Sequence, residues 1–468
     1  MKSKYTLKYL ALFCAVFFTF SCEDFLDPGI PKSDLISTTV FTDDASAEGA
    51  ITGLYHGMMS AAAGGYASGH TQSVTSLCGI SADLLSEYST GISRTGFFEN
   101  TILPQNTINF NLWSDLYQNI YRTNAALEGL EISTELTPDK KQQLEGEAYF
   151  IRAFTYFYLV NLYGEVPLLQ TTDYRQNATA SKNSVDEIYH LIIADLEMAE
   201  ILLPNNFSPY SEERIRVNQF GAKAMLARVY LYLEDWIKAE QYASEVISSP
   251  LFELYHQDAL DEVFMANSSE AIWQLFPIHP SYNTYEGYIF VLENDPSLSS
   301  FSSMALSPDF VETFEVDDQR RFDWISYFDL GEVQYPYPFK YKVKSGSDLT
   351  EYSMVLRLAE QYLIRGEARL KQGNLPGAKE DLNRIRHRAG LLNTNATTPE
   401  AIMDAIMEER KKELFTEWGH RWLDLKRTKT IGKVLGELKP LWDSHAELFP
   451  IPEQELLDNP NLTPNPGY

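Results

Sequence analysis

The sequence predicts a mainly α protein, in which a tetratricopeptide-like helical-repeat scaffold carries a loop-rich insertion with a few short strands. Apolar residues recur at three- and four-residue steps through much of the chain, which is the periodicity of amphipathic helices. Small residues lie twelve positions apart in two places, as they do in paired repeat helices. Residues 251–350, between these places, lack the helical periodicity. With 468 residues, of which 44% are hydrophobic, the chain can bury a large core.

Residues 1–21 have the pattern of a lipoprotein signal peptide. Three lysines precede a twelve-residue apolar run from Tyr9 to Phe20, which is too short for a transmembrane helix but suits the core of a signal peptide. A small residue, Ser21, and then a cysteine, Cys22, follow, and we expect Cys22 to be acylated and to become the first residue of the mature chain. The alternative is an ordinary secretory signal followed by a chance cysteine.

The remaining cysteines are consistent with a lipidated N-terminus. The chain has three cysteines; Cys14 leaves with the signal peptide and Cys22 carries the lipid. Only Cys78 is then left, so the mature chain cannot form an internal disulfide, and we expect Cys78 to be a buried apolar thiol. Residues 22–45 contain proline, glycine, serine and threonine and are predicted to be a tether.

The charge balance excludes some classes of partner. The formal net charge is −27. Nucleic-acid binding requires a basic surface, so we expect no nucleic-acid partner. Attachment to an anionic membrane by charge alone is also disfavoured. The lipid at Cys22 is therefore the predicted membrane anchor.

Residues 46–250 are predicted to form the N-terminal helical part. Helices are expected near residues 46–60, 110–131, 138–163, 184–203, 216–233 and 235–248. Pro138 suits the first turn of a helix, and Gly164 suits its end. The twelve-residue spacing joins Ala227 to Ala239 and Gly366 to Ala378, which predicts helix pairs that approach closely.

Residues 251–350 are predicted to be a loop-rich insertion rich in aromatic residues. The segment 271–276 (AIWQLF) has the character of a strand. Long loops in a compact protein usually serve a function, and the aromatic content makes disorder improbable. Residues 351–468 return to helical periodicity and are predicted to complete the scaffold.

No sequence pattern indicates catalysis. The nucleophile-elbow, zinc-protease and phosphate-loop motifs are missing from the sequence, and the eight histidines show no metal-ligand spacing. Glu413, Glu417, Arg421 and Asp424 could be taken for an active site, but Arg and Glu at helical spacing usually form ion pairs. We therefore predict a protein that is not an enzyme and has no metal site and no cofactor.

Six segments in chain order resemble the SusD/RagB family of Bacteroidetes nutrient-uptake lipoproteins. The third segment (GEAYFIRAFTYFYLVNLYGEVPLL) and the fifth (EERKKELFTEWGHRWLDLKRT) fit the family pattern well, the latter with Trp418 as a variant. Residues 251–350 match the family only in position. The six segments are residues 21–27, 110–130, 146–169, 355–370, 408–428 and 448–468.

This resemblance implies a function. Family members are outer-membrane lipoproteins that face the cell surface, bind a glycan and deliver it to a SusC-like TonB-dependent transporter, which supplies the transport energy. An oligopeptide ligand, as for proteins of the RagB type, is the alternative within the same architecture. A repeat scaffold without any ligand and a hydrolase are two further alternatives. A scaffold alone predicts that residues 251–350 expose no aromatic platform.

The resemblance places ligand contacts in two loop regions, near residues 83–98 and 282–337. Aromatic rings cover the apolar C–H faces of sugars, and polar neighbours bind the hydroxyl groups. Each of these aromatic residues could instead pack in the core, and we expect at least two of them to contact ligand. The predicted ligand-binding residues are Asp83, Arg94, Phe97, Phe98, Tyr282, Tyr285, Tyr288, Trp324, Tyr327, Tyr335 and Tyr337.

Overall fold

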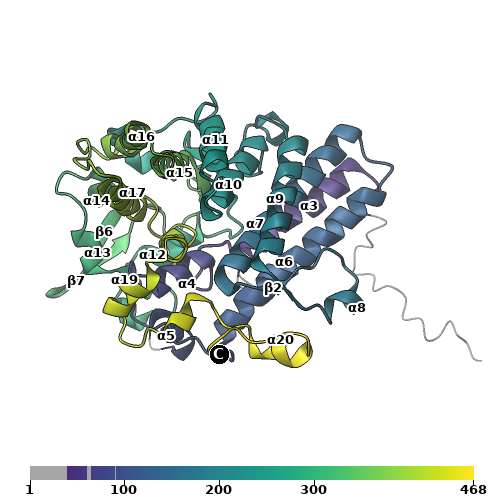
Figure 1. Ribbon diagram of the computed structural model, residues 1–468, viewed down its shortest axis with the longest axis horizontal. Helices are drawn as coiled ribbons and strands as arrows, with labels where there is room; N and C mark the ends of the chain where they lie inside the picture. The colour runs from purple at the N-terminus through teal and green to yellow at the C-terminus, as the bar shows by residue number, and fades with distance from the viewer. Residues whose placement is uncertain (1–39, 61–64, 90) are drawn as a thin grey trace, which may run out of the picture.

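The computed structural model describes residues 40–60, 65–89 and 91–468. The predictions on the signal peptide, on Cys22 and on the tether up to residue 39 lie outside these residues. Helices make up most of the described chain, and strands are few and short (Figure 1). This confirms the predicted fold class. Within the described ranges, no helix is long and apolar enough to cross a membrane.

The N-terminal part is helical, as its periodicity predicts. Thr137 and Pro138 begin α7, which is as long as α6, and Gly164 ends it with φ 75°, a conformation that favours glycine. Ser184 and Glu187 cap the next long helix with reciprocal hydrogen bonds. The elements are α3 (Asp44–Met59), α4 (Val74–Ser81), β1 (Leu85–Glu87), α5 (Ile92–Phe98), α6 (Thr107–Ile132), α7 (Pro138–Tyr163), β2 (Val166–Pro167), α8 (Tyr174–Asn177), β3 (Lys182–Asn183), α9 (Val185–Leu202), η3 (Ser208–Tyr210), α10 (Gln219–Tyr232) and α11 (Trp236–Ile247).

The segment between the helical parts contains short elements. β6 and β7 form an antiparallel hairpin, and β5 pairs with β1 far back in the chain. The predicted strand at 271–276 is observed as β4, which pairs with β8. The elements are η4 (Gln257–Glu262), β4 (Ala271–Leu275), α12 (Tyr285–Phe290), η5 (Pro296–Leu298), β5 (Met304–Leu306), α13 (Pro308–Glu312), α14 (Gln319–Asp323), β6 (Ile325–Leu330), β7 (Val333–Pro338) and β8 (Ser353–Arg357).

The C-terminal part returns to helices and ends in a packed segment. Asn465 is buried, and its side-chain amide donates to the carbonyl oxygens of Tyr163 and Phe449, both at 2.9 Å. The chain end is therefore held against α7. The elements are α15 (Leu358–Lys371), α16 (Leu375–Arg388), α17 (Pro399–Glu413), α18 (His420–Arg427), α19 (Ile431–Leu438), η6 (Ser444–Glu447) and α20 (Glu453–Asp458).

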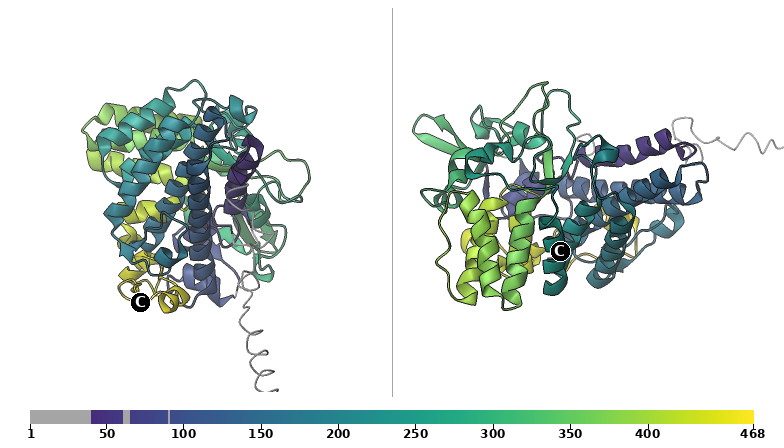
Figure 2. Two further views of the ribbon diagram at one scale, coloured as in Figure 1. Left: turned by 90° about the vertical axis from the view of Figure 1, so that its right-hand side faces the viewer. Right: turned by 90° about the horizontal axis from the view of Figure 1, so that it is seen from above.

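The long helices form one continuous array. Successive neighbours are α6, α7, α9, α10, α11, α15, α16 and α17. The contact between α11 and α15 joins helices that are separated in sequence by the whole insertion. Seen from above, the loops of the insertion and α3 lie toward one side of the molecule, and α15–α17 lie toward the other (Figure 2).

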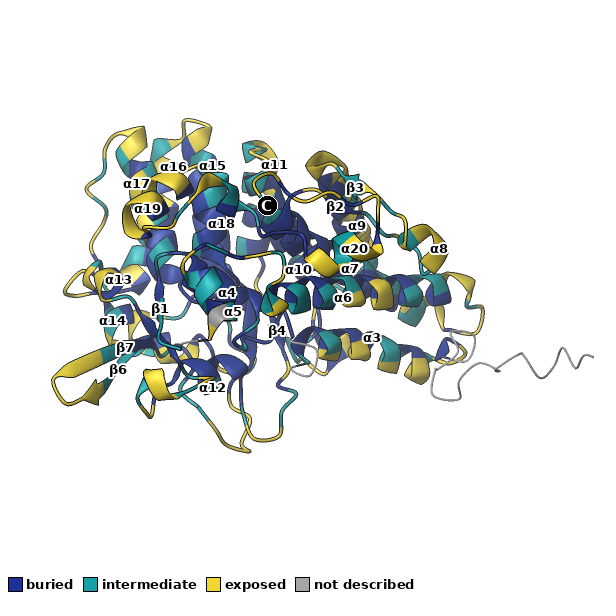
Figure 3. Ribbon diagram, turned by 90° about the horizontal axis from the view of Figure 1, so that it is seen from below, coloured by how far each residue is buried: buried dark blue, intermediate teal, exposed yellow. Residues whose placement is uncertain are grey.

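The predicted small residues lie where repeat helices meet. Ala227, Ala239 and Ala378 are fully buried. A Cβ on Gly366 would lie 3.3 Å from the Cβ of Asp381, so the pair α15–α16 approaches as closely as a glycine allows. Figure 3 shows buried residues along the inner faces of the helices and exposed residues at the tip of the β6–β7 hairpin. The spacing of small residues thus correctly predicted the helix pairs.

Candidate functional site

Six aromatic rings from three separate segments come together beside α12. Tyr282 is stacked between His279 and Tyr288, with ring centroids 3.9 Å apart on both sides and interplanar angles of 9° and 19°. Tyr285 contacts Tyr282 edge-on at 5.7 Å. His70 lies 5.5 Å from Tyr285 and 5.9 Å from Phe301. We call these rings the aromatic cluster: His70, His279, Tyr282, Tyr285, Tyr288 and Phe301.

The aromatic cluster is partly open to solvent. Phe301 is 46% exposed, His279, Tyr282 and Tyr288 are half-buried, and Tyr285 is buried. The structure therefore brings together the three tyrosines that the sequence predicted. It adds His70, His279 and Phe301, which were missed. His279 continues the three-residue spacing of the tyrosines backward and could have been found; the other two come from distant loops.

Buried polar groups fix the loop that carries the tyrosines. The Asn283 side chain accepts hydrogen bonds from the backbone N–H of Thr350 at 2.6 Å and of Glu351 at 2.9 Å. The Thr284 hydroxyl caps α12 by accepting from the N–H of Gly287. A Cβ on Gly287 would lie 2.4 Å from the carbonyl oxygen of Val343, so only glycine fits there. The cluster is thus held on a rigid support.

The ionisable groups next to the aromatic cluster are neutral or already paired. Burial raises the pKa of Glu286 to about 8, so this carboxyl is protonated at neutral pH and accepts from the Ser353 hydroxyl at 2.8 Å. Burial lowers the pKa of His70, and the charge of Arg94 lowers it further. The ammonium group of Lys344 donates to the carbonyl oxygens of Tyr288 and Val291 and to a serine hydroxyl.

A polar pocket of about 370 Å³ adjoins the aromatic cluster. Ser300 lines this pocket, and the next residue in the chain, Phe301, belongs to the cluster. The Arg94 guanidinium donates from Nη2 to the carbonyl oxygen of Ser300 at 2.9 Å. Arg94, one of the predicted ligand-binding residues, lines this pocket and is 7% exposed. We call it the serine pocket; its described lining residues are Ser89, Gly91, Ser93, Arg94, Ile108, Ser297, Leu298, Ser299 and Ser300.

Three of the predicted aromatic contacts are corrected by the structure. Phe97 is fully buried on α5, which replaces the loop predicted there, and its ring packs edge-on against Phe449 at 5.2 Å. Trp324 is also fully buried, and its indole N–H donates to the carbonyl oxygen of Leu260 at 2.9 Å. Tyr337 belongs to a small apolar cluster under the hairpin. A ligand cannot reach these rings without unfolding their surroundings.

Asp83 and Phe98 are also occupied by structural contacts. Both carboxylate oxygens of Asp83 accept from Arg421, at 2.8 and 2.7 Å, which joins the end of α4 to α18. Burial would raise the pKa of Asp83, but Arg421 holds it below its usual value. Phe98 is half-buried, with the Lys439 ammonium 5.0 Å from its ring centroid. Neither residue belongs to the candidate site.

The last two predicted residues lie on the β6–β7 hairpin. Tyr327 is 37% exposed and faces Pro336 across the hairpin. Tyr335 is half-buried and meets Tyr88 edge-on at 5.1 Å. Among the described residues, neither ring contacts the aromatic cluster. The hairpin therefore presents a second, smaller aromatic surface.

A cavity larger than the serine pocket lies elsewhere, between the helix pairs. It measures about 520 Å³ and is lined by residues of α10, α11, α15, α17, α18 and α19. Its strongest polar groups already pair with each other, because Arg427 forms two hydrogen bonds of 2.7 Å with Glu367. Trp236 is partly covered by the ammonium group of Lys371. The described lining residues of this cavity form no stack of aromatic rings, so we place the candidate site at the aromatic cluster.

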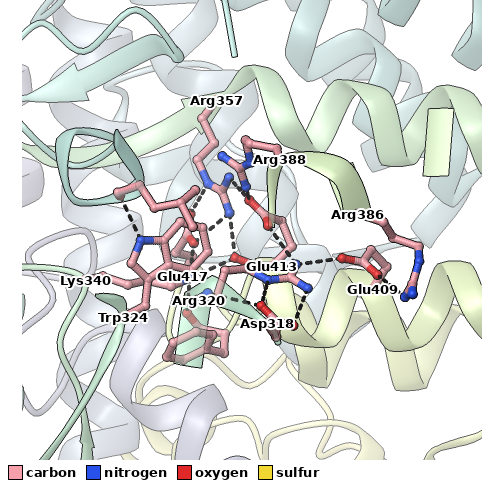
Figure 4. A network of polar contacts seen from close by, with 12 residues as sticks. Asp318, Arg320, Trp324, Lys340, Arg357, Arg386, Arg388, Glu409, Glu413 and Glu417 are labelled. Carbon is pink, nitrogen blue, oxygen red and sulfur yellow. Dashed lines mark hydrogen bonds and ion pairs between the residues drawn. The ribbon is translucent and has the colours of Figure 1, made fainter. Parts of the chain in front are cut away.

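The charged residues near the C-terminus form ion pairs, as predicted (Figure 4). Glu413 is fully buried and lies 3.0 Å from Arg320 and 2.5 Å from Arg357, and it also pairs with Arg388. Glu417 pairs with Arg357 at 2.7 Å and with Lys340 at 2.5 Å. This buried network fastens the insertion to the turn between α17 and α18. These groups contact one another and are not arranged around a cavity.

The other two charged residues of this region are paired too. Asp424 accepts from Arg410 at 2.8 Å and from Arg427 at 2.7 Å, and Arg421 binds Asp83. The pKa of Asp424 lies below its usual value because these arginines outweigh the effect of burial. Within the described part of the chain, no group of three or more His, Cys, Asp and Glu side chains could hold a metal ion.

Comparison with known proteins gives matches over most of the chain. Residues 24–231 match a family described as starch-binding and associating with the outer membrane, and residues 331–468 match the SusD family. SusD-like protein P2 of Formosa agariphila is 30% identical over 412 residues, covering 76% of this chain and 80% of that protein. The starch-binding protein SusD of Bacteroides thetaiotaomicron is 32% identical over 126 residues, 24% of this chain and 21% of that protein.

Solved structures show the same fold. A SusD superfamily protein from Bacteroides vulgatus superposes with a TM-score of 0.80 at 23% identity, over 91% of this chain and 99% of that one. A laminarin-binding SusD-like protein superposes with a TM-score of 0.76 at 24% identity, over 91% of this chain and 100% of that one. From these matches and the shared helical array, the chain belongs to the SusD family.

Proposed function

We propose that this protein is a cell-surface lipoprotein that binds a glycan at the aromatic cluster and passes it to a SusC-like TonB-dependent transporter. One observation carries the ligand class: three rings stack at 3.9 Å next to an exposed Phe301 and a polar pocket. Flat rings suit the C–H faces of sugars, and the pocket offers hydroxyl and guanidinium partners. Since Tyr282 is covered on both faces, we propose that sugar rings contact the exposed Phe301 and the half-buried His279 and Tyr288.

The relatives support this proposal. One structural neighbour is named as laminarin-binding and another as a surface glycan-binding protein from Bacteroides uniformis, at a TM-score of 0.74. A scaffold without ligand predicts no exposed aromatic platform, and the exposed rings disfavour that alternative. The charged residues of the C-terminal motif are engaged in buried ion pairs. This motif was the strongest candidate for an active site in the sequence. We therefore propose a binding protein without catalytic activity.

The experiment is a binding panel with the full chain purified in mild detergent. Neutral polysaccharides, acidic polysaccharides and peptide digests are screened by affinity electrophoresis, and calorimetry follows each interaction found. Binding to a polysaccharide is the expected result. Binding to peptides alone would support the oligopeptide-binding alternative, and hydrolysis of any polymer during the assay would contradict a purely binding role. Co-purification of a TonB-dependent barrel with the tagged chain from outer membranes tests the proposed transporter partner.

Lipidation at Cys22 remains part of the proposal. It rests on the signal-peptide pattern and on the association of the matched family with the outer membrane. Mass spectrometry of the membrane-extracted chain, with Cys22→Ser as the comparison, tests it. The acylated mass should be lost in the variant, together with membrane association.

A further inference from the structure

The serine pocket contains a buried guanidinium nitrogen without a partner. Arg94 uses Nη2 on the carbonyl oxygen of Ser300, at 2.9 Å, and its Nε lies 3.5 Å from the carboxylate of Glu87. The third nitrogen, Nη1, is buried and has no hydrogen-bond partner among the described residues; the same is true of the Ser89 hydroxyl. Buried polar groups are normally satisfied, so this pocket is prepared for a ligand group.

The contacts of Arg94 leave part of its guanidinium group available to a ligand. A guanidinium binds a carboxylate or a sulfate most strongly with two parallel N–H groups. In Arg94, Nε faces Glu87 and one N–H of Nη2 is engaged with Ser300, so Nη1 is the one nitrogen of this group without a partner among the described residues, and it carries two N–H groups. These N–H groups can donate to the hydroxyl oxygens of a sugar. The unpartnered Ser89 hydroxyl can donate to the same group or accept from it.

The charge of Arg94 is already balanced. The Glu87 side chain is 1% exposed, and its other oxygen accepts from the N–H of Ser89 at 2.7 Å, so the carboxylate is fixed behind Arg94. Arg94 is the only charged residue among the described lining residues. The nearby Lys344 ammonium is engaged with three oxygens. An anionic group entering the serine pocket would lose its hydration without meeting an uncompensated cation.

The net charge of the protein also disfavours anionic ligands. At a formal charge of −27, the chain repels polyanions at a distance. This long-range effect is screened by salt, whereas the local effect of Glu87 is buried and is not. The two contributions can therefore be separated by experiment.

From this geometry we infer that the serine pocket binds an uncharged hydroxyl group and rejects carboxylate and sulfate, so that the ligand is a neutral glycan. The inference rests on the proposed glycan-binding function and adds the chemical class of the glycan. Arg94 and Glu87 act together: Arg94 supplies N–H donors, and Glu87 balances the positive charge that would attract acidic sugars.

The test compares one polymer in two charge states. The neutral polysaccharide that binds most tightly in the panel is partly oxidised at its primary hydroxyls to carboxylates, and both forms are titrated at low and high salt. We expect the oxidised form to bind the wild-type chain at least about tenfold more weakly, with a difference that persists at high salt. In Glu87→Gln, which keeps the acceptor for Ser89, the difference should shrink. Arg94→Gln should weaken binding of the neutral form.

The outcomes separate this inference from the proposed function. Equal or tighter binding of the oxidised polymer, or an acidic polysaccharide as the best ligand of the panel, overturns the neutral class while leaving glycan binding intact. The wild-type comparison decides this even if Glu87→Gln fails to fold. An unchanged ratio in a folded Glu87→Gln overturns the role of Glu87. No binding to any polysaccharide overturns the proposed function and this inference together.

Discussion

Glu413 gives the sharpest test of the claim that the charged residues near the C-terminus hold the fold together. Burial alone would raise the pKa of Glu413, but the charges of Arg388, Arg357 and Arg320 hold it well below its usual value. The side chain is therefore a carboxylate at neutral pH. Glu413→Gln keeps its shape and removes its charge, so it leaves three buried guanidinium groups without their shared partner.

The expected size of the effect follows from this geometry. Removing one partner of a buried ion pair costs about 3–5 kcal/mol of unfolding free energy. For a chain of 468 residues, an unfolding entropy of about 2.1 cal/mol/K per residue makes each 1 kcal/mol worth about 1 °C. We therefore expect the Tm of Glu413→Gln to fall by roughly 3–5 °C. Because the pKa of Glu413 in the folded protein lies well below 4.5, its ion pairs give their full stabilisation above about pH 4.5. The fall in Tm of Glu413→Gln should therefore be the same from pH 6 to pH 8.

Thermal unfolding followed by circular dichroism measures the change. Glu408→Gln is the matched control, since Glu408 lies on the same helix α17, is exposed and forms no ion pair within 4 Å among the described residues. Its Tm should stay within about 1 °C of wild type. Glycan affinity, measured well below the Tm, should be unchanged in both variants. Loss of affinity with unchanged Tm in Glu413→Gln would refute the structural role and point to a ligand site.

Two further predictions concern the support of the aromatic cluster. Because burial raises the pKa of Glu286 to about 8, the native state keeps a proton that the unfolded chain releases, and stability falls as the pH rises from about 4.5 to 8. Glu286→Gln should therefore raise the Tm by roughly 5 °C at pH 9 and leave it unchanged at pH 4; equal shifts at both values would contradict this. Gly287→Ala should lower both Tm and glycan affinity, because its Cβ meets the carbonyl oxygen of Val343 at 2.4 Å. Gly49→Ala, in open space on α3, should be neutral or slightly stabilising, and a similar loss in both glycine variants would rule out the clash as the cause.

The helical scaffold could be predicted because its signals are local. Pro138 and Gly164 mark the ends of α7, and the twelve-residue spacing of small residues marks the helix pairs α10–α11 and α15–α16. Helix caps and close helix contacts are determined by a few residues near one another in sequence. The contact between α11 and α15, across the insertion, has no such local signal.

The candidate site could be predicted only in part. The spacing of Tyr282, Tyr285 and Tyr288 correctly identified residues that lie together. The sequence could not show that Phe301 and His70 come from other loops to join them, because these contacts depend on the packing of the insertion. It also could not separate Trp324, which fills the core, from an exposed ring, since irregular segments have no period that reveals the buried face.

The most direct test of the central claim is calorimetric titration of the best-binding polysaccharide into three forms of the chain. Tyr282→Ala/Tyr288→Ala removes two rings of the stack, and Tyr327→Ala removes an exposed ring of the hairpin. We expect the double variant to lose affinity by about 10- to 100-fold while remaining folded, and Tyr327→Ala to bind like wild type. Full affinity in the double variant, with loss in Tyr327→Ala, would show that the glycan binds at the hairpin and that the aromatic cluster is not the site.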